Sequence, residues 1–325
     1  MDARKIVVTG ATFPEAVTKE LETGGFTIEC IPGDLTDTEV VRALQGAWGY
    51  VLGGSEHMGR DVWARIPGLA VVCFLGTGYS SFMEVPSEDV GIRFTYTPHA
   101  NAMAVAEFAV AQMLDIVRGL TRRIDGVQAG QWNEEATPSL IGARLGVAGM
   151  GHIGHEVARM ARSAFDMDVY YWNRTRRLEF DSLPYTMVPT LTDLCEAVDV
   201  LAVCFAHQPG ENDGAIGAAE LTALGVDGYI VNATRAALVD PLALRTALAE
   251  GWIAGASFDG YYIEPTPAPA DDAYGLLQFI PDKLLVTPHC AYLSSQAIRR
   301  MADMATENFL AVSRGDAPPY AIAQG

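Results

Sequence analysis

The sequence is organised around Leu145-Gly-Val-Ala-Gly149-Met-Gly151-His-Ile-Gly154, in which a short apolar run ends at the first of three glycines with G-x-G-x-x-G spacing. Apolar residues then recur about every four positions, at Ile153, Val157, Ala161 and Phe165. This pattern predicts a strand, a tight turn and an amphipathic helix.

Each glycine of this turn has an expected role in binding a dinucleotide. Gly149 permits the turn, Gly151 lets a pyrophosphate approach the backbone, and Gly154 lets the helix pack closely on its strand. The helix N-terminus also offers N–H groups and a positive dipole end to the phosphates. A plain glycine turn is the alternative, but the strand-turn-helix context favours the dinucleotide site. The predicted cofactor contacts here are Gly149, Gly151, His152, Ile153 and Gly154.

The residues after the second strand bear on the choice of nicotinamide cofactor. Asp168–Trp172 is predicted as that strand, and Asn173 follows where an acidic residue would bind the ribose 2′-hydroxyl. The chain continues with Arg174-Thr-Arg-Arg177, and guanidinium groups bind phosphate oxygens in a bidentate fork. With Asn173, Arg174 and Arg177 as contacts, we predict NADP(H) over NAD(H). NAD(H) remains open, because an asparagine can still bond a hydroxyl.

Length, composition and charge restrict the class of protein. With 325 residues, 50% of them hydrophobic, the chain can form two domains with sizeable cores. It has 22 Lys and Arg against 40 Asp and Glu, and the net charge of −18 opposes binding to nucleic acid and to anionic membranes. No apolar run approaches the roughly 18 residues of a membrane span, and the start of the chain is predicted as a strand rather than a signal peptide.

Cysteine and histidine usage predicts neither disulfides nor a metal site. The five cysteines are widely spread without a C-x-x-C pair, and most lie in apolar runs, so we expect buried reduced thiols and a cytoplasmic protein. His152 and His155 lie three apart, but no cysteine or acidic pattern completes a zinc site.

Short apolar runs alternate with helical stretches along the chain. In the first part, strands are predicted at 5–9, 26–30, 50–53, 70–74 and 93–95, with helices within 18–23, 38–47 and 60–66. A long helix at 101–120 and a polar loop at 126–138 follow. In the second part, strands are predicted at 199–205, 228–232, 255–258 and 284–286, and helices at 218–224 and 241–250. The alternation indicates two α/β domains, each with a doubly wound parallel sheet. A last helix at 294–313 is expected to return to the first domain.

Three polar residues of the second part follow predicted strands: Arg235, Glu264 and His289. Side chains at the carboxyl ends of parallel strands meet at the cofactor crevice. A guanidinium can bind a substrate carboxylate and polarise a ketone, and an imidazole can exchange a proton with the ketone oxygen. A carboxylate can orient that imidazole and favour its protonated form. Each residue alone fits a surface ion pair or a satisfied histidine; together they predict hydride exchange between a 2-keto acid and a 2-hydroxy acid.

The chain resembles the D-isomer-specific 2-hydroxyacid dehydrogenases along essentially its whole length. The resemblance rests on Gly149-Met-Gly151-His-Ile-Gly154, Asn232-Ala-Thr-Arg235-Ala-Ala-Leu-Val-Asp240, Ala254-Gly-Ala-Ser-Phe-Asp259, Glu264-Pro265 and Thr287-Pro-His289, which occur in the family's order. Ala104-Val-Ala-Glu107 and Arg118 also resemble the family's helix that enters the cofactor domain.

The resemblance implies a Rossmann cofactor domain, residues 102–290, inserted into a flavodoxin-like substrate domain made of residues 1–101 and 291–325. It implies the roles given above for the three polar residues, and a homodimer. It also implies that Asp259 binds the nicotinamide carboxamide, with a helix or turn cap as the alternative. The loop Gly76-Thr77-Gly78, with Tyr79 beside it, is expected to bind the substrate carboxylate through its amides, with an ordinary turn as the alternative.

Three departures from the family pattern stand out. Ala236 follows Arg235 where glycine is usual, and His152 stands where Arg or Lys is common, so phosphate binding is expected to depend on backbone amides and Arg174. His207 lies in a segment that replaces a Pro- and Thr-rich loop; it is expected at the surface, with a cofactor contact as the alternative.

The predicted activity is that of an NADP(H)-dependent 2-ketoacid reductase acting on glyoxylate, hydroxypyruvate or a bulkier analogue. A phosphite dehydrogenase shares the three polar residues and remains an alternative. A nucleotide-sensing corepressor that binds partner proteins also remains, because such relatives can retain these residues. A formate dehydrogenase would carry Gln in place of Glu264 and is set aside.

Overall fold

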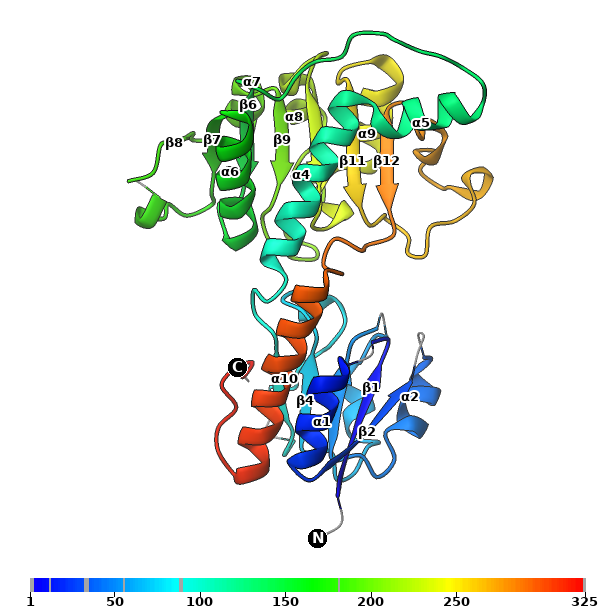
Figure 1. Ribbon diagram of the computed structural model, residues 1–325, viewed down its shortest axis with the longest axis vertical. Helices are drawn as coiled ribbons and strands as arrows, with labels where there is room; N and C mark the ends of the chain where they lie inside the picture. The colour runs from blue at the N-terminus through cyan, green and yellow to red at the C-terminus, as the bar shows by residue number, and fades with distance from the viewer. Residues whose placement is uncertain are drawn as a thin grey trace. The chain divides into compact units, whose positions relative to one another are not determined.

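The computed structural model describes residues 3–11, 13–31, 35–54, 56–87, 90–180 and 182–323. The chain divides into two compact units, of which unit 1 comprises residues 1–101 and 293–325 and unit 2 comprises residues 102–292. In Figure 1 the chain leaves unit 1 into helix α4 and returns to it with helix α10. Unit 2 is therefore inserted between two segments of unit 1.

Unit 1 is built on a five-stranded parallel sheet of order β2-β1-β3-β4-β5. The strands are β1 (Arg4–Thr9), β2 (Phe26–Ile31), β3 (Gly49–Leu52), β4 (Val71–Phe74) and β5 (Arg93–Tyr96). Its helices are α1 (Glu15–Thr23), α2 (Asp37–Ala43), α3 (Arg60–Trp63) and α10 (Ser295–Arg314). This strand order is that of flavodoxin-like folds.

Alternate residues of β1 pack on opposite faces of this sheet. Ile6 and Val8 share a buried cluster with Phe309 of α10, while Val7 shares another with Val40 of α2 and Trp63 of α3. Every residue of β3 and β4 is buried, as expected where helices cover both faces of a parallel sheet.

Unit 2 has a seven-stranded parallel sheet of order β12-β11-β10-β9-β6-β7-β8. The strands are β6 (Arg144–Ala148), β7 (Asp168–Trp172), β8 (Tyr185–Met187), β9 (Val200–Val203), β10 (Tyr229–Asn232), β11 (Gly255–Asp259) and β12 (Leu284–Thr287). The strand order reverses between β6 and β9, and ligands of such sheets bind outside the carboxyl ends of the strands at this point.

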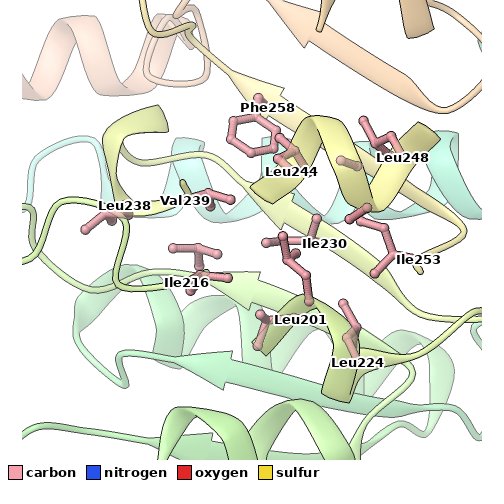
Figure 2. Packing of buried hydrophobic residues seen from close by; sticks show 14 of the residues in the cluster. Leu201, Ile216, Leu224, Ile230, Leu238, Val239, Leu244, Leu248, Ile253 and Phe258 are labelled. Carbon is pink, nitrogen blue, oxygen red and sulfur yellow. The ribbon is translucent and has the colours of Figure 1, made fainter. Parts of the chain in front are cut away.

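Helices cover both faces of the unit 2 sheet. They are α4 (Ala102–Arg118), α5 (Leu120–Gln128), α6 (His152–Phe165), α7 (Leu191–Ala197), α8 (Ala218–Leu224) and α9 (Pro241–Glu250). Figure 2 shows one core, where Leu201 and Ile230 of the sheet pack against Leu244 and Leu248 of α9. A second core joins β6 to α4 and α6. Short 3-10 turns are η1 (Tyr79–Ser81), η2 (Leu178–Phe180), η3 (Ala236–Leu238), η4 (Pro269–Asp271) and η5 (Leu277–Phe279).

The structure differs from the predicted elements in three places. The long helix predicted to reach residue 120 ends at Arg118, because Gly119 takes a left-handed conformation with φ +59°. Helix α5 then occupies residues 120–128, part of which was predicted as a loop. Strand β8 and helix α7 were not predicted, although Thr190 and Asp193 form a capping box that marks the start of α7.

The cysteines only partly follow the expectation of buried thiols. Cys73 and Cys195 are buried, Cys204 and Cys290 are partly buried, and Cys30 is exposed; all five are free. Burial raises the pKa of Cys73 to about 11. Within the described ranges, no helix is both long and apolar enough to span a lipid bilayer.

Candidate active site

The turn between β6 and α6 shows why glycine is required at two of its positions. Gly149 has φ +97°, and a Cβ there would lie 2.5 Å from the backbone nitrogen of Phe205. A Cβ on Gly154 would overlap the carbonyl oxygen of Gly149 and lie 2.8 Å from Cγ1 of Val147. Gly154 therefore lets α6 approach β6, as its position in the motif predicts.

Gly151 differs, because the space beside it is open. A Cβ there would meet no heavy atom of the described residues within 4 Å, and Gly151 is the residue that caps the N-terminus of α6. The first turn of a helix has N–H groups without intrahelical partners, and these favour anions. The open space and the helix N-terminus fit the pyrophosphate of a dinucleotide.

Asn173 ties the end of β7 to the glycine turn. Its Oδ1 accepts a hydrogen bond from the backbone N–H of Met150 at 2.6 Å. The oxygen expected near a ribose hydroxyl is thus engaged by the neighbouring loop, a contact that the sequence did not predict.

The two predicted arginine contacts have different partners. Arg174 Nη1 donates to Oε1 of Gln208 at 2.6 Å, whereas Arg177 lies 3.6 Å from the carboxylate of Glu179. His207, beside Gln208, contacts Oδ1 of Asp213 at 2.5 Å, and its side chain is only 12% exposed. Arg174 therefore has a neutral partner in the loop after β9, while Arg177 has an acidic one.

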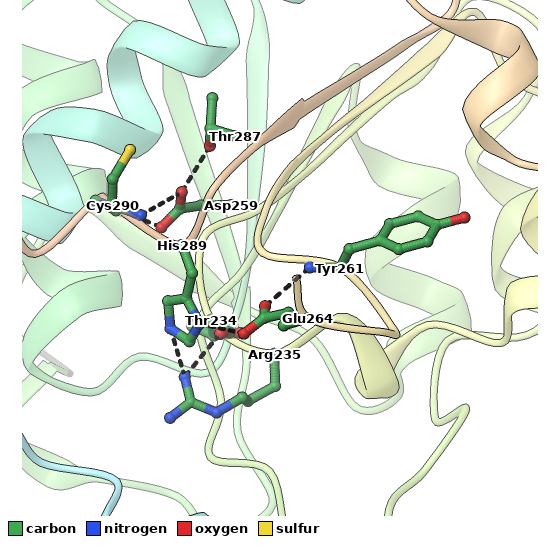
Figure 3. A network of polar contacts seen from close by, with 9 residues as sticks. Thr234, Arg235, Asp259, Tyr261, Glu264, Thr287, His289 and Cys290 are labelled. Carbon is green, nitrogen blue, oxygen red and sulfur yellow. Dashed lines mark hydrogen bonds and ion pairs between the residues drawn. The ribbon is translucent and has the colours of Figure 1, made fainter. Parts of the chain in front are cut away.

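Arg235, Glu264 and His289 meet beyond the carboxyl ends of β10, β11 and β12 in unit 2, as Figure 3 shows. His289 Nδ1 lies 3.0 Å from Oε2 of Glu264, and His289 Nε2 lies 3.2 Å from Nη1 of Arg235. The imidazole thus lies between the carboxylate and the guanidinium.

These contacts define the protonation of the imidazole. A guanidinium only donates hydrogen bonds, so Nε2 of His289 must accept from Arg235. An ionised carboxylate only accepts, so Nδ1 must carry the proton that faces Glu264. The arrangement is that of a neutral imidazole with its Nε2 lone pair directed at Arg235.

The electrostatics keep Glu264 ionised. Burial raises the pKa of Glu264, but the hydrogen bonds from His289 and from the Tyr261 N–H at 2.9 Å, together with the charge of Arg235, bring it below the ordinary 4.5. Burial lowers the pKa of Arg235, and the negative charges of Glu264 and Asp259 act in the opposite direction. A guanidinium nevertheless stays charged at neutral pH.

The turn that presents Arg235 is held by a buried amide. Asn232, 1% exposed, donates from Nδ2 to the Arg235 carbonyl at 2.9 Å and accepts the Thr234 N–H at 3.0 Å. Ala236, where the family usually has glycine, begins the η3 turn. It does not have a positive φ: among the described non-glycine residues, only His99, Asp166 and His289 do. The methyl group at 236 thus meets no backbone restriction.

Two further residues shape the site without having been predicted. Gly260 has φ +95°, and a Cβ there would overlap Oε1 of Glu264. Thr287 donates to Oδ1 of Asp259 at 2.6 Å, and Asp259 is itself 3% exposed at the end of β11. For Gly260, the sequence signal was its position directly after a strand.

The predicted substrate loop lies in unit 1, after β4. A Cβ on Gly76 would lie 2.7 Å from the ring of Phe74, and Thr77 Oγ1 accepts the His99 N–H at 3.0 Å. Gly78 precedes η1, whose Tyr79 ring packs edge-to-face on Tyr96 at 5.5 Å. Across the described ranges, no group of three or more His, Cys, Asp or Glu side chains is arranged to hold a metal ion.

Comparison with known proteins decides the family. The sequence model of the D-isomer specific 2-hydroxyacid dehydrogenase NAD binding domain matches residues 110–291, more than half of the chain. The chain belongs to the D-isomer-specific 2-hydroxyacid dehydrogenases. Both the family resemblance and the fold class predicted from the sequence are confirmed.

Relatives of this dehydrogenase family match along most of the chain. Glyoxylate reductase from Korarchaeum cryptofilum is 33% identical over 83% of this chain and 81% of that protein. Glyoxylate reductase from Aeropyrum pernix is 30% identical over 99% of this chain and 96% of that protein. A crystal structure of NADPH-dependent glyoxylate/hydroxypyruvate reductase from Sinorhizobium meliloti, in complex with NADP and malonate, also matches. The match has a TM-score of 0.80 and 28% sequence identity, and it covers 99% of this chain and 98% of that chain.

Proposed function

We propose that this protein transfers a hydride between NADP(H) and a small 2-keto or 2-hydroxy acid. The observation that carries the proposal is the chain of contacts from Glu264 through His289 to Arg235. The relatives named as glyoxylate and glyoxylate/hydroxypyruvate reductases support glyoxylate or hydroxypyruvate as the kind of substrate.

Arg235 binds the substrate in this mechanism. Its guanidinium has five N–H donors, enough to hold the carboxylate and also polarise the adjacent ketone. Nη1 already faces Nε2 of His289 at 3.2 Å, so a ketone oxygen that replaces this contact lies within reach of both nitrogens.

His289 moves the proton. In the reduction, the imidazole starts with a proton on Nε2 and donates it to the ketone oxygen. The imidazole is then in the neutral Nδ1–H form described above. In oxidation the neutral imidazole accepts the hydroxyl proton instead. The ionised Glu264 stabilises the imidazolium and holds the ring in place. A bound nicotinamide supplies or accepts the hydride.

The remaining roles are assigned to the two units. Unit 2 binds the dinucleotide at the glycine turn, and unit 1 contributes the loop from Gly76 to Tyr79 to substrate binding. Arg174 binds the 2′-phosphate of NADP(H), because a phosphate can displace its neutral partner Gln208, whereas Arg177 is paired with Glu179.

The protein acts as a homodimer in this proposal. Helix α5 exposes three apolar side chains on one face: Leu120 at 55%, Ile124 at 49% and Val127 at 57%. Trp132 and Ile141, in the segment after it, are 80% and 75% exposed. Apolar surface of this extent is typical of a contact between protein chains, and dimers are common in the family.

Exchanging Arg174 for Asp tests the cofactor assignment. The variant is expected to raise the KM for NADPH at least about tenfold, because a carboxylate repels the 2′-phosphate that the guanidinium binds. The KM for NADH should change little. Arg245→Asp, the same charge change at an exposed position of α9, serves as the control. Equal loss for both cofactors in Arg174→Asp would contradict the role.

Two alanine substitutions in the glycine turn should behave differently. Gly151→Ala is expected to leave the thermal midpoint unchanged and to weaken cofactor binding, because its methyl group fills the open space proposed for the pyrophosphate. Gly149→Ala is expected to destabilise the fold by about 2 kcal/mol or more, through strain at positive φ and overlap with Phe205. Thermal melts and NADPH fluorescence titrations measure both effects. Unchanged NADPH affinity in folded Gly151→Ala would contradict this placement of the cofactor.

The function itself is tested with a panel of 2-keto acids, followed by nicotinamide absorbance with NADPH and with NADH. We expect glyoxylate or hydroxypyruvate to oxidise NADPH. Phosphite with NADP⁺ is included, and turnover with phosphite alone would favour the phosphite dehydrogenase alternative. Binding of NADPH without turnover of any substrate would favour a dinucleotide sensor.

A further inference from the structure

The Asp259 carboxylate accepts three hydrogen bonds from the short segment that contains His289. Its Oδ1 accepts from the Thr287 hydroxyl at 2.6 Å and from the Cys290 N–H at 2.9 Å. Its Oδ2 accepts from the Ala291 N–H at 2.8 Å. All three donors lie within residues 287–291, on both sides of His289, as Figure 3 shows for Thr287 and Cys290.

The backbone of His289 needs such support. His289 has φ +52°, a left-handed conformation that is unfavourable for non-glycine residues. Its own N–H bonds back to the Thr287 carbonyl at 2.9 Å, which closes a tight turn. This turn aims the imidazole at Glu264 and Arg235.

We propose that Asp259 is a positioning residue, whose carboxylate fixes the turn at 287–291 and thereby holds the His289 ring between Glu264 and Arg235. The proposal rests on the proposed function for the catalytic meaning of His289, but the geometric claim is independent of it. A carboxylate has about four acceptor sites, of which three are used here. The fourth acceptor site stays available, so holding the turn is compatible with the contact to the nicotinamide carboxamide that the family resemblance implies.

Two substitutions separate the two roles. In Asp259→Asn the amide NH₂ replaces one acceptor and faces an N–H donor, so at least one of the three bonds is lost. In Thr287→Val one donor is lost, while the carboxylate stays free to bind a cofactor. Ser257→Ala is the matched control, because Ser257 is a buried β11 residue whose hydroxyl has no hydrogen-bond partner among the described residues.

If Asp259 positions His289, kcat at saturating cofactor should fall about tenfold in Thr287→Val and about 100-fold in Asp259→Asn, the scale of one or two charge-assisted hydrogen bonds. The dissociation constant of NADPH, from fluorescence titration, should stay within about twofold of wild type. In the His289→Ala background, Asp259→Asn should cause no further loss. Wild-type kcat in Thr287→Val, or NADPH affinity weakened as much as kcat in Asp259→Asn, would overturn the proposal.

A spectroscopic measurement on the protein without cofactor tests the geometry separately from activity. The His289 Nδ1–H proton that faces Glu264 should give a low-field NMR resonance in ¹⁵N-histidine-labelled protein, identified by its loss in His289→Ala. The resonance should persist in Ser257→Ala, weaken in Thr287→Val and vanish in Asp259→Asn. An unchanged resonance in folded Asp259→Asn would overturn the positioning role. Absence of turnover in the wild type would contradict the proposed function. The NMR resonance would still decide whether Asp259 positions His289.

Discussion

His289→Ala is expected to lower kcat for keto-acid reduction by about 10²–10⁴-fold, the contribution of a positioned general acid. The ring contacts both Glu264 and Arg235, and its Nε2 faces the position proposed for the ketone oxygen. Its contacts do not include the glycine turn, so the dissociation constant of NADPH should remain nearly that of the wild type. Steady-state rates and a fluorescence titration measure the two quantities.

His57→Ala is the control for this substitution, because His57 is an exposed histidine whose side chain is 60% accessible. It should retain wild-type kcat. A His289→Ala enzyme with more than about one-tenth of the wild-type kcat would show that another group supplies the proton, because that loss is below the range for general acid catalysis.

Arg235→Lys is expected to lower kcat/KM for the keto acid by about 100-fold or more, because one ammonium cannot hold a carboxylate and a ketone oxygen as a guanidinium fork does. Lysine keeps the positive charge, so the loss reports on geometry rather than on net charge. The loss of Arg235 Nη1 also removes the donor to His289 at 3.2 Å, so kcat should fall together with the rise in KM.

A substrate without a carboxylate sharpens the test of Arg235. Because the guanidinium is proposed to recognise the carboxylate, Arg235→Lys should affect a simple aldehyde much less than glyoxylate. Arg245→Lys, at an exposed position of α9, should leave both rates unchanged. An unchanged kcat/KM for glyoxylate in Arg235→Lys would contradict the assigned role.

Local steric requirements made much of the fold predictable. The roles assigned to Gly149 and Gly154 follow from their spacing, and the structure shows the close contacts that a side chain would violate. The buried strands were recognised because a parallel sheet covered on both faces is apolar throughout. The buried face of α4 was not predictable in the same way: Met103 and Leu114 are 50% and 37% exposed, whereas Ala106 and Met113 are buried. A helix with apolar residues on several faces does not specify which face packs.

The candidate site was predictable only in part. Arg235, Glu264 and His289 could be named because each follows a strand, and parallel strands bring their carboxyl ends together. The hydrogen bonds that hold them could not, because Asp259 and Thr287 lie 28 positions apart and meet only when β11 pairs with β12. The Asn173 contact to Met150 likewise depends on the pairing of β6 with β7.

The most direct test of the account follows the hydride itself. Glyoxylate is incubated with the protein and NADPH that carries deuterium at both C4 positions, and the product is analysed by mass spectrometry. The account predicts glycolate with one deuterium on C2 from the wild type, and almost none from His289→Ala at equal protein concentration. NADPH oxidation without deuterium in the product, or equal labelling by His289→Ala, would contradict it.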